Sequence, residues 1–167
     1  MAVSSPERLQ MRFDLLDTNG SATLTSADFA FFASRVCRVL GVPADSPKAR
    51  ALAEGCRRYW EGLAATADRD KDGQVTFEEY CSFSHDDSWF AEYGEAYVAA
   101  VSTVCDLDDD GLIERDHFLG HHSAAGFPLP YSAKLFSDLD DGGAGRVRTE
   151  EFADFLRKFY TGADDLL

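Results

Sequence analysis

Basic residues, methionines and long uncharged apolar segments are scarce in this sequence. Only 16 residues are lysine or arginine, against 30 aspartates and glutamates, and the net charge is −14. This excess of negative charge argues against binding to the phosphate backbone of a nucleic acid. The most apolar early stretch, residues 29–42, is interrupted by Arg35 and Arg38 and is too short to span a bilayer. We therefore expect neither a nucleic-acid partner nor a membrane partner.

Closely spaced cysteines are absent as well. The four cysteines lie far apart, each in an apolar helical context: Cys37, Cys56, Cys81 and Cys105. Such spacing is typical of buried free thiols in a reducing compartment and not of disulfides. Residues 1–6 show neither the pattern of a secretion signal nor the glycine needed for myristoylation. We expect a soluble, cytoplasmic, monomeric protein.

A fourfold internal repeat organises the chain. Each repeat begins with an aspartate, has an aliphatic residue seven positions later and an aromatic residue twelve positions later. The repeats start at Asp17, Asp68, Asp106 and Asp140; the aliphatic residues are Leu24, Val75, Ile113 and Val147, and the aromatic residues are Phe29, Tyr80, Phe118 and Phe152. Four segments in one register indicate four copies of one structural unit.

Apolar residues at helical spacing flank each repeat and predict helices before and after it. One helix should end at residues 41–43, the next should begin near residues 46–47, and a later helix should run from residues 86–88 to Cys105. Residues 126–130 contain two prolines and should form a non-helical link.

The predicted fold is all-α, with four helix–loop–helix units in two paired lobes. The lobes should comprise residues 1–84 and 85–167. Short antiparallel bridges should join the paired loops, between Leu24 and Val75 in the first lobe and between Ile113 and Val147 in the second.

The oxygen-bearing side chains inside the repeats have a spacing that suits a hard cation. Calcium takes six to eight oxygen ligands, and a twelve-residue loop supplies them from positions 1, 3, 5, 7, 9 and 12, with glycine at position 6. The second repeat meets every requirement, with Gly73 at position 6 and a hydroxyl or a water at Thr76. Its predicted ligands are Asp68, Asp70, Asp72, the carbonyl of Gln74 and a bidentate Glu79.

The first repeat keeps an oxygen at each ligand position but has fewer charges. Its predicted ligands are Asp17, Asn19, Ser21, Thr23 and Asp28. Ala22 replaces the glycine, which costs about 1 kcal/mol in left-handed backbone strain. Because Asp28 is one methylene shorter than glutamate, magnesium should compete with calcium more effectively at this loop.

The third and fourth repeats depart further from the pattern. The third has His117 in place of the closing glutamate, and histidine suits softer metals, so we expect weaker calcium binding there. Its predicted ligands are Asp106, Asp108, Asp110, the carbonyl of Leu112 and Glu114. The fourth repeat lacks side-chain oxygens at positions 3 and 5 and carries Arg146 and Arg148. We expect the fourth loop to hold no ion and to support the third structurally.

These motifs resemble the EF-hand superfamily over nearly the whole chain. Loop starts separated by 51, 38 and 34 residues are similar to those of sarcoplasmic calcium-binding proteins and calerythrin-like proteins. The resemblance implies a compact, two-lobed protein with inward-facing apolar surfaces. It also implies that the protein is a calcium buffer or signal modulator.

Two other functions stay open. In a calcium sensor, ion binding would expose an aromatic surface to a protein partner, although two methionines are few for such a binding surface. In an apolar-ligand carrier of the photoprotein type, a cavity would be lined by Trp60, Trp89, Tyr93, Tyr97 and His121. Enzyme activity is not expected, because the histidines lie in no nucleophile pattern. We interpret His117 and His121 as solvent-facing.

Overall fold

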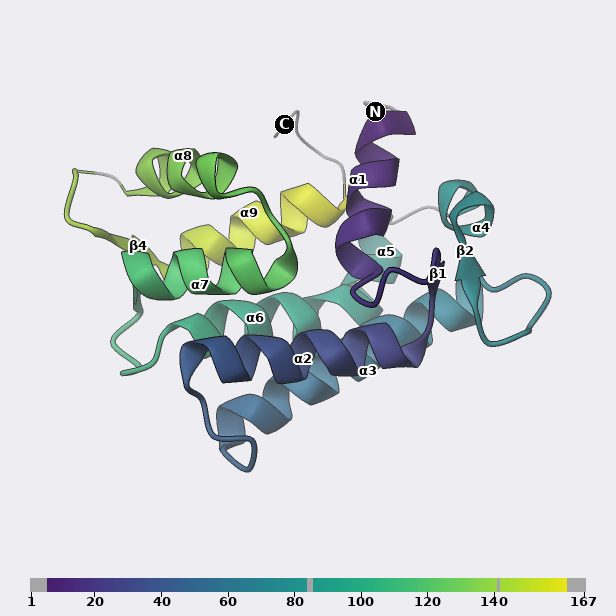
Figure 1. The fold of residues 1–167 in the computed structure, drawn as a ribbon, viewed down its shortest axis with the longest axis horizontal. Helices are drawn as coiled ribbons and strands as arrows, with labels where there is room; N and C mark the ends of the chain where they lie inside the picture. The colour runs from purple at the N-terminus through teal and green to yellow at the C-terminus, as the bar shows by residue number, and fades with distance from the viewer. Residues whose placement is uncertain (1–5, 84–85, 141, 162–167) are drawn as a thin grey trace.

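The computed structural model describes residues 6–83, 86–140 and 142–161, and this part of the chain is mostly helical (Figure 1). The predicted all-α class is confirmed. The helices are α1 (Pro6–Leu16), α2 (Ser26–Leu40), α3 (Pro47–Thr66), α4 (Phe77–Ser82), α5 (Asp87–Trp89), the π-helical segment η1 (Phe90–Gly94), α6 (Glu95–Cys105), α7 (Arg115–Ala125), α8 (Leu129–Leu139) and α9 (Thr149–Thr161). The expected lobe boundary at residues 84–85 lies outside the described residues.

Two short antiparallel sheets join the loops in pairs. Strand β1 (Thr23–Leu24) pairs with β2 (Val75–Thr76), and β3 (Leu112–Glu114) pairs with β4 (Arg146–Arg148). Leu24 lies opposite Val75 and Ile113 lies opposite Val147, as predicted. The repeated aliphatic residue therefore serves both the ladder and the core, because all four side chains are buried. Figure 1 shows β1 and β2 at one end of the long axis and β4 at the other.

Helices α3 and α6 connect the two halves of the chain through the most extensive helix contact among the described residues. The two helices run antiparallel. Gly55 of α3 faces Ala96 of α6, whereas Gly62, further along α3, faces Tyr93 of η1, the segment just before α6. A Cβ at Gly55 would lie 2.8 Å from the Ala96 carbonyl oxygen, so glycine is required for this close approach. The apolar residues of both halves form one continuous core.

The long predicted helix before the third loop is present as α5, η1 and α6. Asp86 caps it, because its side chain accepts a hydrogen bond of 2.8 Å from the Trp89 backbone N–H. Across the described residues, the helices include none with the length and apolarity needed to cross a membrane.

Three local expectations are wrong. Cys81 is exposed, because α4 turns its neighbour Tyr80 toward the core, whereas the other three cysteines are buried. His121 is not solvent-facing and is only 2% exposed. The link after α7 is shorter than expected, since α8 already begins at Leu129; Pro130 fits because the first turn of a helix needs no backbone N–H donor.

Candidate metal centres

All four loops share one backbone arrangement, set by the aspartate at position 1. Its carboxylate accepts hydrogen bonds from the backbone N–H groups of positions 5 and 6, at 2.8–3.3 Å in every loop. The aspartates are Asp17, Asp68, Asp106 and Asp140. These bonds curl the backbone of each loop in the same way. The fourth loop keeps the same curl, although it has no side-chain oxygen at positions 3 and 5.

Positions 4 and 6 of each loop have left-handed backbone conformations. A left-handed conformation was expected at position 6, and Ala22, at position 6 of the first loop, has a φ of 68°. Position 4 was not anticipated, and two non-glycine residues, Lys71 and Asp109, have φ values of 57° and 59°. The left-handed region is unfavourable for side chains with a Cβ, so the loop geometry outweighs local preference at these positions.

Replacing Ala22 with glycine should stabilise the protein by about 0.5–1 kcal/mol, because glycine relieves left-handed strain but has more freedom to lose on folding. The matched change Gly73→Ala, at the same position of the second loop, should destabilise it by a similar amount. No atom lies within 4 Å of a Cβ built at Gly73, so only backbone strain changes. Urea unfolding of both variants in chelator measures the effect; changes of the same sign would contradict it.

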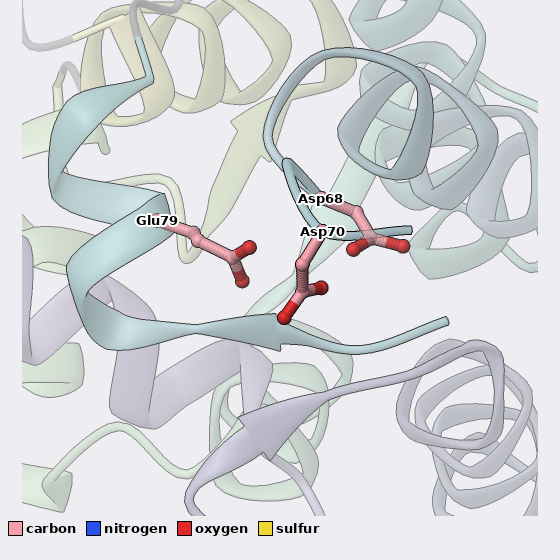
Figure 2. Close-up of side chains that lie close together, drawn as sticks. All are labelled: Asp68, Asp70 and Glu79. Atoms are coloured by element: carbon pink, nitrogen blue, oxygen red, sulfur yellow. The ribbon is translucent and has the colours of Figure 1, made fainter. Parts of the chain in front are cut away.

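The second loop brings three acidic side chains together. One oxygen each from Asp68, Asp70 and Glu79 lies within 4.8 Å of the others, and Figure 2 shows the three side chains close together. Desolvation raises the pKa of Asp70, whereas a hydrogen bond from the Thr76 backbone N–H lowers the pKa of Glu79 and keeps it charged. Asp72, also predicted as a ligand, is not part of this group. Its carboxylate instead accepts a hydrogen bond from the Gln74 backbone N–H at 2.8 Å.

Glu79 belongs to a capping box at the start of α4. Its two oxygens accept hydrogen bonds from the backbone N–H groups of Arg69, at 3.0 Å, and Thr76, at 2.9 Å, while the Thr76 hydroxyl accepts from the Glu79 N–H. One carboxylate therefore ties the loop's beginning to the helix that leaves it. Threonine followed by glutamate three residues later is the sequence signal for this second role, which the ligand pattern alone does not reveal.

The first loop has the same arrangement with a shorter carboxylate. Asp28 is fully buried and accepts hydrogen bonds from the backbone N–H groups of Asn19, at 3.2 Å, and Thr25, at 2.8 Å. Burial raises the pKa of Asp28. Ser21 Oγ is turned to the Thr23 carbonyl oxygen at 2.9 Å, so two of the predicted ligands contact each other.

The third loop gathers its opening residues but not its closing ones. Asp106, Asp108 and Asp110 have oxygens within 4.8 Å of one another. Glu114 instead lies beside His117, with 3.2 Å between its Oε2 and the imidazole Nδ1. In the fourth loop Arg148 lies 3.6 Å from Glu151, the residue at the closing position. The third loop therefore differs from the second at its closing position, where His117 replaces the glutamate.

The aromatic residues considered for a carrier cavity pack against their neighbours. Trp89 contacts Tyr59, Phe83 and Tyr93 at ring-centroid distances of 4.8–5.6 Å, and Trp60 contacts Phe29 at 5.9 Å. The cavity beside Tyr97 has a volume of about 10 Å³, which accommodates about one water molecule. This cavity is too small for an aromatic chromophore.

Comparison with known proteins decides the family. Residues 6–84 match the model described as an EF-hand domain pair. A solved structure of a calcium-binding protein from Streptomyces coelicolor is 30% identical to this chain, covers 93% of it and 96% of its own length, and superposes with a TM-score of 0.80. The chain is an EF-hand protein.

The narrower resemblance is confirmed too. Calerythrin of Saccharopolyspora erythraea is 27% identical to this EF-hand protein over 168 residues, covering 96% of this chain and 94% of calerythrin. A sarcoplasmic calcium-binding protein from amphioxus, at 17% identity, shares the fold with a TM-score of 0.69 and coverage of 96% and 92%. The chain therefore belongs to a family of calcium-binding proteins.

Proposed function

We propose that this EF-hand protein is a monomeric cytoplasmic calcium buffer or signal modulator. The second loop is the strongest site, the first and third loops bind more weakly, and the fourth binds no ion. The observation that supports this best is the convergence of Asp68, Asp70 and Glu79 within 4.8 Å. Carboxylates this close repel one another unless a cation lies between them.

The donor set of the second loop fits calcium by its chemistry. Every predicted ligand is an oxygen, from the carboxylates of Asp68, Asp70, Asp72 and Glu79 and the carbonyl of Gln74. A bound calcium ion would supply positive charge at the junction of α3 and α4. Because Glu79 already ties the loop to α4, part of the ordering needed for binding is present beforehand.

A buffer is favoured over a sensor by the scarcity of methionine, of which the sequence has two. Among the described residues, four large apolar side chains are exposed, and they lie on α2, the third loop and α8: Phe31, Val39, Leu107 and Leu129. A sensor needs a broad apolar face that ion binding uncovers, and methionine-rich surfaces suit that role. The proposal also includes competition between magnesium and calcium at the first loop. It includes binding to a protein partner as well.

Calcium should raise the melting temperature of the chelator-treated protein by about 5–10 °C when its concentration is 100 times the Kd. Titration calorimetry should count two or three sites, and added magnesium should weaken calcium binding mainly at the weaker ones. The fluorescence of an apolar dye should stay constant or fall on adding calcium. An unchanged melting temperature would contradict the proposal, whereas a strong rise in dye fluorescence would favour the sensor.

A further inference from the structure

A lysine from the first half of the chain lies against the third loop. Lys48, in the first turn of α3, forms an ion pair of 2.8 Å with Asp109 and donates a hydrogen bond to the backbone carbonyl oxygen of Asp106. The two partners are positions 4 and 1 of the third loop. The Lys48 side chain is 20% exposed, so its charge is only partly screened by water.

The position of this lysine follows from the antiparallel packing of α3 and α6. The start of α3 lies beside the end of α6, where the third loop begins, as Figure 1 shows. A cation at the C-terminus of a helix is favoured by the helix dipole, and the Asp106 carbonyl belongs to that terminus. Asp109 then holds the ammonium group beside the loop. Because 58 residues separate Lys48 from Asp106, the loop motif alone does not reveal the contact.

The positive charge of Lys48 lies beside a loop in which three carboxylates are gathered. The three opening carboxylates of this loop are close together, but the closing position is His117, so no carboxylate stands where Glu79 closes the second loop. Asp109 itself is not at a ligand position, and its side chain is turned to Lys48 instead. Position 4 of the other loops is glycine or lysine, and therefore has no acid for a cation to pair with.

We propose that Lys48 sets the calcium affinity of the third loop, which makes it an affinity-determining residue outside the loop. Resting on the proposed function, this inference adds a role for a residue of the other half of the chain. Its positive charge offsets the repulsion among Asp106, Asp108 and Asp110 when no cation is present. The same charge opposes a divalent ion, so the third loop binds more weakly than its own residues require.

The test is a calcium titration that follows each loop separately by NMR. The backbone N–H of Gly111 donates to Asp106 at 2.8 Å and that of Gly73 donates to Asp68 at 3.0 Å, so their amide resonances report on the third and second loops. Lys48→Met keeps the apolar stem and removes the charge. It should tighten binding at Gly111 by about three- to tenfold and leave binding at Gly73 unchanged.

Removing the other member of the pair should have the opposite effect. Asp109→Asn leaves the lysine charge uncompensated and tolerates the left-handed backbone, so the third loop should bind about three- to tenfold more weakly. The double variant should return to within about twofold of the wild type. Lys48→Arg keeps the charge and should behave as the wild type. Lys134→Met breaks a comparable but exposed pair with Asp138 and should change neither loop.

The outcomes separate this inference from the proposed function. A Gly73 resonance that does not respond to calcium in the wild type would refute calcium binding at the second loop, whatever Lys48 does. If Gly73 responds, unchanged or weaker binding at Gly111 in Lys48→Met would overturn the role of Lys48. A Gly111 resonance that fails to respond in both proteins would overturn it as well. A response at Gly111 that appears only in Lys48→Met would support it.

Discussion

Glu79→Gln is expected to weaken calcium binding at the second loop by about 100-fold, equivalent to about 2.7 kcal/mol. Glutamine has nearly the same shape, but it offers one neutral oxygen where the bidentate carboxylate offers two charged ones. The loss falls on a position whose negative charge is maintained, since the hydrogen bond from the Thr76 backbone N–H lowers the pKa of Glu79. Titration calorimetry with wild type and variant measures the change directly.

The neighbouring glutamate provides the matched control. Glu78 precedes Glu79 on α4, is exposed and is not a predicted ligand. Glu78→Gln removes the same charge and should change calcium affinity by less than about threefold. Equal losses in the two variants would show that general surface charge, and not the geometry of Glu79, governs binding.

Glu79→Gln should also lower the stability of the protein without calcium. One of the two backbone N–H donors that now meet a carboxylate oxygen, from Arg69 and Thr76, would face the amide NH₂ group. Loss of one capping interaction costs about 1 kcal/mol, so chelated Glu79→Gln should unfold at lower urea concentration. Glu78→Gln has no such effect, because its side chain is exposed.

The sequence was sufficient for features that follow from the repeated twelve-residue loop motif. The register of Leu24 with Val75 and of Ile113 with Val147 follows from equal positions in paired loops. The hydrogen bonds of the aspartate that opens each loop follow from the loop motif in the same way. Side-chain spacing fixes the geometry of each loop within about a dozen residues, and the register follows because the paired loops are copies of one motif.

The contacts of Lys48 and the burial of His121 depend on how separate helices pack. Nothing in the residues around Lys48 indicates Asp109, because the approach of α3 to α6 decides the contact. For the histidines a signal was present. His121 and His122 follow Phe118 by three and four positions, the spacing of one helix face, and Phe118 is the repeated aromatic residue of the third unit. Their polarity led to the wrong prediction for His121.

The buried histidine pair should make the protein sensitive to acid. His121 packs against Phe32 and Phe152, and within the described part of the chain neither of its ring nitrogens has a hydrogen-bond partner. His122 lies with its Nδ1 3.0 Å from the Phe118 carbonyl oxygen, whereas its Nε2 has no such partner. Both side chains are at most 2% exposed, so a positive charge on either would be poorly solvated.

The direction of the pH effect follows from the pKa shifts of the two histidines. Burial lowers the pKa of His122 to about 4 and holds the pKa of His121 well below its usual value. In the unfolded chain both titrate near pH 6.5, so between about pH 4 and 6.5 the unfolded state binds more protons. The free energy of unfolding therefore falls as the pH falls through this window. His122 alone accounts for about 3 kcal/mol, at 1.36 kcal/mol for each unit of pKa shift.

Replacing His121 with leucine separates this effect from the titration of the many carboxylates. The change removes a buried polar group that lacks partners and should stabilise the protein by about 2 kcal/mol at pH 7. Below pH 6.5 the gain should grow, because leucine takes up no proton when the chain unfolds, while the carboxylates titrate alike in both proteins. Urea unfolding of both proteins from pH 7 to 4.5 in chelator measures the difference. A difference that stayed constant with pH, or a less stable variant at pH 7, would show that His121 is accommodated in the core by a partner that offsets its burial.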